Sequence, residues 1–430
     1  MVKSEKKEVH ANLRILASSA YFVLFSIILS KILGYVYRLV VARQFGAEAY
    51  GLFSLAIMVV GISVSLASLG LGEGLARFIP IYRGTNSPDK ARFIFRKTLK
   101  ITVFLSVILT VLLFVYSNFV ATVFFKDPNL ASFLRIFSLS IPFAVSGGIF
   151  LASLRAYEKV REYSFTLNVV QTVSRVLAIL LLVYLGVQSS SISYSYLISI
   201  ILVLLVSYYY CKSRIPDILF SSKLNKNKQK EITQSLVSYS LPLLITGIVY
   251  SLFFWIDSFT IAYLKSATEV GIYNSAVTIA LLLLVIPEIF MQLFFPLISK
   301  ENAKGNKKLI SELSKQVTKW IFLINLPLLT LFILFPKEGI KILFGQEFTS
   351  AANSLRILSI GVIAYSISLV SYNLVNMSGK SRKTLMYMII ATIVNFILNF
   401  VLIPMEKIWF IENSSGINGA ALATTISMFL

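Results

Sequence analysis

The stretch that decides the fold is SKILGYVYRLVVARQFGAEAYGLFSLAIMVVGISVSLASLGLGEGLARFIP, residues 30–80. It holds two long apolar segments joined by a short polar turn. Lys31 and Arg38 lie within the first segment, and Glu73 and Arg77 close the second. Charge inside an apolar span of this length is costly unless it faces water, a partner or a ligand. The stretch therefore predicts a helical hairpin in a membrane whose charged side chains have a pairing or binding role.

The composition extends this interpretation to the whole chain. Hydrophobic residues make up 57% of the 430 residues, charged residues 14%, and the mean hydropathy is +0.80. These values predict an all-α polytopic membrane protein. The net charge of +21 is then explained by basic loops on the cytoplasmic side, so we expect no nucleic-acid partner. One cysteine and one histidine exclude an internal disulfide and a Cys/His metal cluster, so we expect no metal, no cofactor and no enzyme.

Apolar segments of about 17 to 25 residues, enough to cross a bilayer, predict twelve transmembrane helices. The last segment starts near Ile417 and stops at Leu430. Fourteen helical residues span roughly 21 Å, less than the ~30 Å hydrocarbon core, so we expect the native chain to continue. The segments lie at about 14–42, 50–70, 101–120, 133–154, 164–187, 192–210, 236–263, 271–297, 317–335, 354–376, 385–403 and 417–430.

The basic residues alternate between the loops on the two sides. Of the 40 lysines and arginines, 29 fall in the loops that are cytoplasmic if the N-terminus is inside, and 9 fall in the alternating loops. This bias places the N-terminus in the cytoplasm, and an even number of helices places the C-terminus there too. We therefore expect a multi-pass protein of the cell membrane with both termini cytoplasmic.

The chain also repeats itself. Residues 47–51 (AEAYG) return as residues 267–271 (ATEVG), at an offset of 220, and residues 134–138 (LRIFS) return as residues 355–359 (LRILS), at an offset of 221. Each copy holds six predicted helices, so the repeats are parallel. The predicted organisation is an N-lobe, a cytoplasmic linker and a C-lobe, at residues 1–212, 213–235 and 236–430.

Three runs in the first half carry a family resemblance: SKILGYVYR (30–38), ARQFGAEAYGLFS (42–54) and LGLGEGLARFIP (69–80). Together with residues 257–273 and 416–424, they resemble the Wzx-type flippases of the multidrug/oligosaccharidyl-lipid/polysaccharide (MOP) exporter superfamily. The resemblance covers essentially the whole chain. It implies two six-helix lobes around a central cavity and transport by alternating access. It also implies polyprenyl-(pyro)phosphate-linked oligosaccharides as substrates, moved from the cytoplasmic to the outer leaflet.

The first lobe carries the candidate substrate-binding residues. Lys31 and Arg38 are seven residues apart and lie near one face of a helix, and Arg175 is deep in the fifth apolar segment. Such a cationic stripe suits a diphosphate, and we add Arg77 to it. The alternatives are that Lys31 and Arg38 extend to the interface, that Arg175 pairs with a neighbouring helix, and that Arg77 forms an ion pair with Glu73.

The second lobe differs in the sign of its charges. Asp257 and Glu288 lie within apolar segments and are candidates to bind a coupling ion, H⁺ or Na⁺, or to compensate the arginines; Glu73 is a third candidate. Glu288 follows Pro287, which interrupts helical hydrogen bonding and favours a hinge.

Two other functions compete with a flippase for lipid-linked oligosaccharide. The first is a multidrug or cation antiporter of the same superfamily, whose cavity would need carboxylates rather than arginines. The second is a membrane-embedded glycosyltransferase or polysaccharide polymerase. Such enzymes need a larger outer loop than the longest one predicted here, at about residues 336–353.

Overall fold

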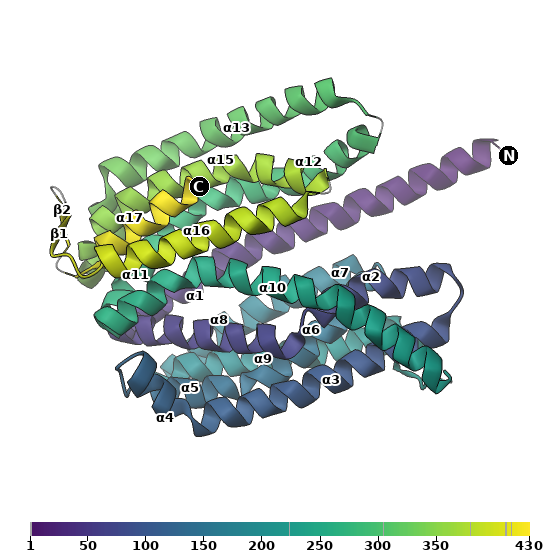
Figure 1. The fold of residues 1–430 in the computed structure, drawn as a ribbon, viewed down its shortest axis with the longest axis horizontal. Helices are drawn as coiled ribbons and strands as arrows, with labels where there is room; N and C mark the ends of the chain where they lie inside the picture. Colours follow the sequence, from purple (N-terminus) through teal and green to yellow (C-terminus); the bar gives the residue numbers. More distant parts are fainter. Residues whose placement is uncertain (1, 223, 304, 379, 409–410, 414) are drawn as a thin grey trace. The chain divides into compact units, whose positions relative to one another are not determined.

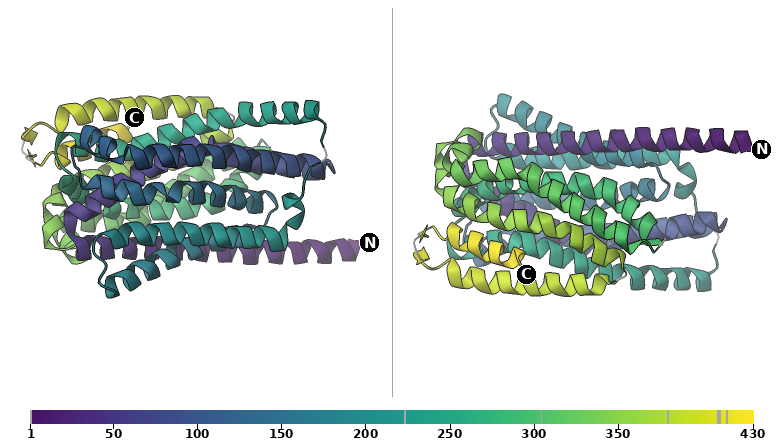
Figure 2. Two further views of the ribbon diagram at one scale, coloured as in Figure 1. Left: turned by 90° about the horizontal axis from the view of Figure 1, so that it is seen from below. Right: turned by 90° about the horizontal axis from the view of Figure 1, so that it is seen from above.

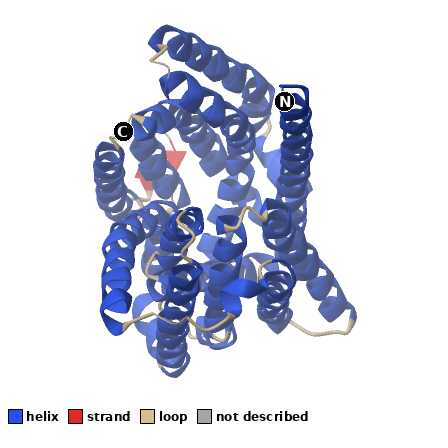
Figure 3. Ribbon diagram, turned by 90° about the vertical axis from the view of Figure 1, so that its right-hand side faces the viewer, coloured by secondary structure: helices blue, strands red, loops and turns tan. Residues whose placement is uncertain are grey.

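The computed structural model describes residues 2–222, 224–303, 305–378, 380–408, 411–413 and 415–430. The described chain is almost entirely helical, as the composition predicts (Figure 3). The helices of the first half are α1 (Val2–Ser68), α2 (Leu71–Gly84), α3 (Pro88–Val115), α4 (Ser117–Phe119), α5 (Leu130–Ser138), α6 (Ser140–Ala156), α7 (Val160–Ser164), α8 (Gln171–Tyr184) and α9 (Ser190–Arg214) (Figure 1). Those of the second half are α10 (Lys226–Leu264), α11 (Ala267–Ala280), α12 (Val285–Ala303), α13 (Lys307–Leu334), α14 (Pro336–Leu343), α15 (Ala352–Met377), α16 (Ser381–Leu402) and α17 (Ile417–Met428).

Short irregular segments connect these helices. Two are π-helical, η1 (Val120–Phe124) and η2 (Phe165–Val170), and three are 3₁₀ turns, η3 (Pro216–Leu219), η4 (Leu281–Leu284) and η5 (Gln346–Ala351). One antiparallel pair of two-residue strands, β1 (Lys407–Ile408) and β2 (Ile411–Glu412), lies between α16 and α17.

The twelve predicted segments are all helical in the structure. Among the described residues, nine helical stretches are long and apolar enough to cross a membrane, or ten if α5 and α6, bent by 41°, form one span. The first two predicted segments both lie in α1, which is broken at Gly46 (φ 81°, ψ −178°). This positive φ is open to glycine because glycine has no Cβ. The remaining segment, α17, has only 12 residues.

Two compact units are formed by the packing. Unit 1 comprises Met1–Arg38, Ala56–Asn118 and Ala131–Ile248, and unit 2 comprises Leu39–Leu55, Phe119–Leu130 and Val249–Leu430. Both α1 and α10 therefore contribute to the two units. The lobes and the linker expected from the sequence stay a prediction.

The core of unit 1 forms around α2, which the apolar segments alone do not predict. Leu71, Leu75 and Ile79 recur every four residues, and all three are buried in one apolar cluster with side chains of α3, α6 and α10. Burying side chains of this size stabilises a fold by about 1.5–3 kcal/mol each. The opposite face of α2 exposes Glu73 and Arg77, so the periodicity of α2 is that of an amphipathic helix.

The core of unit 2 includes the point where the two copies of the repeated sequence meet. A Cβ added at Gly51 would overlap the Ala267 carbonyl group, and one added at Gly271 would overlap the Ala47 carbonyl group. The backbones of α1 and α11 therefore touch through repeat-equivalent small residues. In the C-terminal part of unit 2, α15 packs against α13 and α17, and α16 packs against α17 (Figure 2).

Candidate functional site

Arg175 is held within unit 1 by neutral and aromatic partners. Its Nε donates a hydrogen bond to Ser199 Oγ on α9 over 3.3 Å, and its guanidinium carbon lies 4.7 Å from the centre of the Tyr196 ring. The same carbon lies 5.7 Å from the centre of the Tyr37 ring on α1. Such cation–aromatic contacts are stronger where water is excluded. Arg175 is half-buried, so the three helices fix a cation among apolar neighbours.

The Tyr37 hydroxyl brings Arg38 into the same neighbourhood. This hydroxyl lies 3.3 Å from the Ile192 carbonyl oxygen and 3.1 Å from Ser195 Oγ on α9. Both Arg175 and Arg38 interact electrostatically with Tyr37. Arg38 directly follows Tyr37 on α1, so two of the predicted substrate-binding residues lie within electrostatic range of the same tyrosine in unit 1.

Lys31 lies on the same helix, seven residues before Arg38. Its neighbour Ser30 forms a hydroxyl–hydroxyl hydrogen bond of 2.9 Å with Thr172 on α8. Because Thr172 is one turn before Arg175, α1 and α8 run side by side along this part of the candidate site. Lys31 is half-buried in this part of α1.

The two charges of α2 have partners other than those expected. Glu73 forms an ion pair of 2.7 Å with Arg155 on α6 rather than with Arg77. Arg77 instead lies over the ring of Tyr239 on α10, with 4.2 Å between the guanidinium carbon and the ring centre. The alternative of a Glu73–Arg77 ion pair is therefore wrong. Spacing along one helix indicates which side chains can meet, whereas packing brought closer partners from α6 and α10.

Asp257 on α10 is the charge most completely enclosed by polar groups in unit 2. It is 4% exposed. One carboxylate oxygen accepts hydrogen bonds from Tyr273 (2.7 Å) and Thr424, and the other accepts one from Asn399 Nδ2 (2.7 Å). Among the described residues, no lysine or arginine nitrogen lies within 4.0 Å of it. A buried carboxylate surrounded only by neutral donors favours a proton or a bound cation as its counter-charge.

A small cavity beside Asp257 has room for one water molecule or one ion. A cavity of about 20 Å³ is lined by Asp257, Tyr273 and Thr424, among other residues. That volume suits a single water molecule or a monovalent ion. The buried Oδ1 of Asn399 has no hydrogen-bond partner in the described part of the chain. Carboxylate, amide and hydroxyl oxygens are hard ligands, the type that alkali and alkaline-earth cations prefer.

Glu288 on α12 lies in a different setting. It is half-buried and interacts electrostatically with Tyr250 and Tyr365. None of the three residues that bond to Asp257 belongs to this group. The contacts described for the two predicted carboxylates therefore share no residue.

The partners of the charged residues were missed by the sequence analysis, although the sequence carried one indication of them. Asn395 and Asn399 are four apart in an apolar helix, which places both amides on one face. In the structure Asn399 Nδ2 donates to Asn395 Oδ1 over 2.9 Å as well as to Asp257. Tyr196 and Ser199 lie four and seven residues after Ile192, so the three residues share one face of α9. Nothing in the sequence, however, indicates that this face contacts Arg175.

Relatives with this architecture are known from both archaea and bacteria. The sequence is 25% identical over 427 residues to an uncharacterized membrane protein of Methanocaldococcus jannaschii, covering 95% of this chain and 80% of the relative. It is 22% identical to a putative O-antigen transporter of Shigella flexneri, covering 90% and 89% of the two chains. It is also 27% identical to the probable low-salt glycan biosynthesis flippase Agl15 of Haloferax volcanii, covering 61% of this chain and 51% of the relative.

Solved structures share the fold at lower identity. An inward-facing MATE family multidrug transporter of the MOP superfamily superposes with a TM-score of 0.79 at 15% identity, covering 94% of this chain and 95% of the other. The lipid II flippase MurJ superposes with a TM-score of 0.72 at 16% identity, covering 94% and 84%. Residues 242–401 also match the MatE family. Residues 16–301 match the family described as "Polysaccharide biosynthesis protein", and the chain belongs to this family of the MOP superfamily.

Proposed function

We propose that the protein flips polyprenyl-(pyro)phosphate-linked oligosaccharides from the cytoplasmic to the outer leaflet of the cell membrane, for surface polysaccharide or glycan assembly. The observation that carries the proposal is Arg175, a cation held by Ser199, Tyr196 and Tyr37 among apolar helices, with Arg38 next to Tyr37 on α1. A diphosphate leaving bulk water is costly to bury unless fixed cations and donors meet it. The names of two relatives, an O-antigen transporter and a glycan flippase, support this substrate class.

In this proposal Lys31, Arg38 and Arg175 contact the diphosphate, and Arg77 assists at the exposed face of α2. Guanidinium groups suit the contact because each can donate two parallel hydrogen bonds to phosphate oxygens. Ser199 and the rings of Tyr196 and Tyr37 hold Arg175 in place without neutralising it. The positive charge therefore remains available to a ligand.

A coupling ion would bind in unit 2. Asp257 and Thr424 line the small cavity beside Tyr273 and supply oxygen ligands for Na⁺, or Asp257 alone carries H⁺. Glu288, half-buried beside two tyrosines, compensates charge rather than holding the ion. Alternating access then requires that the carboxylate be occupied in only part of the transport cycle.

Leaflet transfer of a fluorescent polyprenyl-diphosphate sugar in proteoliposomes tests the function. Each charge-assisted hydrogen bond contributes about 1.5–3 kcal/mol, so Arg175→Gln or Arg38→Gln should weaken binding roughly 10- to 150-fold. Arg38→Lys should retain part of the activity, because lysine keeps the charge but loses the two-pronged geometry.

Arg135→Gln is the matched control. The Arg135 Nε also donates to a serine hydroxyl in unit 1, Ser117 Oγ at 3.0 Å, but Arg135 is exposed. The control should transport like the unmodified protein. Wild-type binding in both Arg175→Gln and Arg38→Gln would contradict the substrate site. Uptake of organic cations, inhibited by Asp257→Asn, would instead favour the antiporter.

A further inference from the structure

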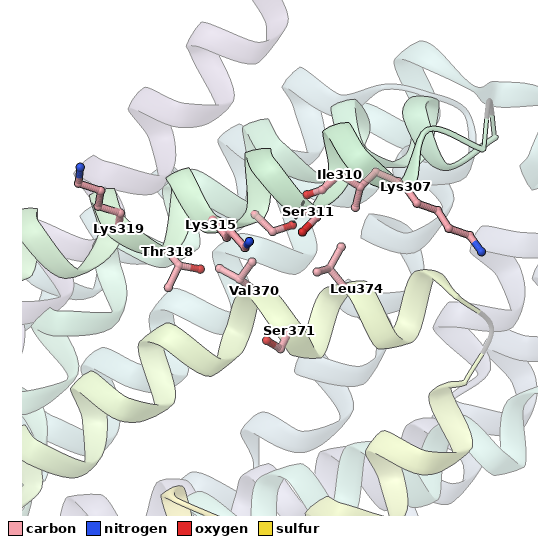
Figure 4. A pocket seen from close by; sticks show the side chains of 10 residues that line it. Lys307, Ile310, Ser311, Lys315, Thr318, Lys319, Val370, Ser371 and Leu374 are labelled. Carbon is pink, nitrogen blue, oxygen red and sulfur yellow. Dashed lines mark hydrogen bonds between the residues drawn. The ribbon is translucent and has the colours of Figure 1, made fainter.

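A basic groove lies on unit 2 between the first turns of α13 and the second half of α15 (Figure 4). Its volume is about 690 Å³. Lys315 extends into the space between the two helices, above Val370, while Lys307 and Lys319 extend away at its two ends (Figure 4). The groove therefore combines an apolar floor with a cationic rim.

Unit 1 has a groove of the same character. It has a volume of about 990 Å³ and lies between α3 and the chain around the start of α10. Arg96, Lys97 and Lys100 supply its charge, and Phe104 and Val107 extend its apolar wall.

The two grooves use equivalent positions of the internal repeat. Arg96 and Lys100 precede Lys315 and Lys319 by the same 219 residues, close to the offset of the repeat, and all four line a groove. In each helix the two cations are four residues apart and lie on one face, an arrangement of like charges that destabilises an isolated helix. Helix stability therefore does not account for finding the same pair twice.

In the described ranges of the chain, these cations have no ion pair with a carboxylate. Within the described part of the chain, no carboxylate oxygen lies within 4.0 Å of the charged nitrogens of Arg96, Lys100, Lys315 or Lys319. A pair of unbalanced cations beside an apolar floor is complementary to an anion that carries apolar chains.

Apolar side chains that face outward follow the cations along both helices. Phe104 and Val107 on α3 are 66% and 48% exposed, and Leu323 and Ile324 on α13 are both 44% exposed. The order of charge and then exposed apolar surface matches the order of headgroup and acyl chains in a lipid leaflet. We propose that each groove binds the phosphate of an anionic membrane lipid, in the leaflet that the loop charges assign to the cytoplasm.

Native mass spectrometry of the purified protein, titrated with phosphatidylglycerol or with phosphatidylcholine of the same chains, tests this proposal. Two phosphatidylglycerol molecules should bind more tightly than any phosphatidylcholine. The variants R96Q/K100Q and K315Q/K319Q should each lose one of the two tight sites. The affinity of the altered site should fall about fivefold per removed cation, the effect of one basic side chain near an anionic lipid surface.

The matched control is R382Q/K383Q, which removes two positive charges from exposed positions of α16 that do not line either groove. It should keep both tight sites, and all three variants should remain monodisperse. Two tight sites remaining in both groove variants, or equal binding of phosphatidylcholine, would overturn the proposal. Displacement of the lipid by millimolar inorganic phosphate would also overturn it, because the grooves would then be sites for the free anion.

Discussion

Arg175 and Asp257 show how single charges are tolerated among apolar helices. Neither has an oppositely charged side-chain atom within 4.0 Å in the described part of the chain. Arg175 is held by a serine hydroxyl and two tyrosine rings, and Asp257 by two hydroxyl groups and an amide. These neutral partners orient each charge while leaving it uncompensated. Each unit thus holds an uncompensated charge, and the two charges are opposite in sign.

At the residue scale, Asp257→Asn should remove the dependence of transport on a Na⁺ or H⁺ gradient. Asparagine keeps the shape of the side chain and can still accept from Tyr273 or Thr424, so the protein should fold. It lacks the negative charge that binds the cation or the proton. Transport in proteoliposomes with an imposed Na⁺ or pH gradient, compared with no gradient, is the measurement.

Glu288→Gln is the comparison for this variant. Glu288 is half-buried, and its electrostatic contacts with Tyr250 and Tyr365 involve none of the residues bonded to Asp257. Glu288→Gln should therefore slow transport less and keep its gradient dependence. The opposite pattern, with gradient dependence lost in Glu288→Gln and kept in Asp257→Asn, would show that Glu288, not Asp257, binds the coupling ion.

At the scale of the helices, the crossing of α1 and α11 explains why an alanine followed four residues later by a glycine recurs in the two copies of the repeat, AEAYG and ATEVG. Ala47 and Gly51 on one helix meet Ala267 and Gly271 on the other, and each glycine lies against a carbonyl group of the opposite helix. Small residues four apart let two backbones approach closely in a membrane, where dispersion contacts rather than hydrophobic burial hold helices together. Each copy of the motif is thus the binding surface for the other.

Gly51→Ala and Gly271→Ala should each push α1 and α11 apart where they cross. The added methyl group would overlap backbone atoms, which have no rotamer to adjust, so each variant should lose about 1–3 kcal/mol or more of stability. The thermal unfolding midpoint in detergent and the yield of monodisperse protein are the measurements. Gly61→Ala, also in α1 but with nothing within 4 Å of an added Cβ, is the control and should unfold like the unmodified protein. Unchanged midpoints for both crossing variants would contradict the close approach.

The same crossing marks the limit of prediction from sequence. Long apolar segments predicted the membrane-spanning helices because their hydropathy is a property of one segment alone. Contacts between segments depend on packing, so neither the Glu73–Arg155 pair nor the Tyr196–Arg175 contact followed from spacing. The charged residues of the candidate site could be found because charge in an apolar span is rare, whereas their neutral serine, tyrosine and asparagine partners are common in such spans.

At the scale of the whole molecule, the internal repeat recurs in three features with different roles. It supplies the small residues of the α1–α11 crossing, the basic grooves of α3 and α13, and a core in each unit. The candidate ligand-binding charges differ between the units, since Arg175 lies in unit 1 and Asp257 in unit 2. Duplication therefore accounts for the scaffold and for the lipid-facing surface, and divergence accounts for the candidate sites.

The orientation of this scaffold in the membrane is the remaining prediction. The bias of 29 to 9 basic residues between alternating loops places the start of α9 outside and the start of α13 inside. Ser189 and Lys308 are exposed at these two places, and Lys308 is preferable to Asn306, whose side chain caps α13 by accepting from Leu309 N. The background is Cys211→Ser, since Cys211 is the single cysteine.

In that background, Ser189→Cys should react with an impermeant maleimide added to intact cells. Lys308→Cys should react only after the membrane is opened, because the reagent cannot reach the cytoplasmic ends of the helices. Labelling of both variants in opened membranes shows that each thiol is accessible and controls for burial. Serine at position 211 keeps the small buried polar group beside the Phe150 carbonyl oxygen, which Cys211 Sγ approaches to 3.5 Å, so the background should fold. Reversed labelling would place both basic grooves and the N-terminus on the outside, and the proposed direction of transport would reverse with them.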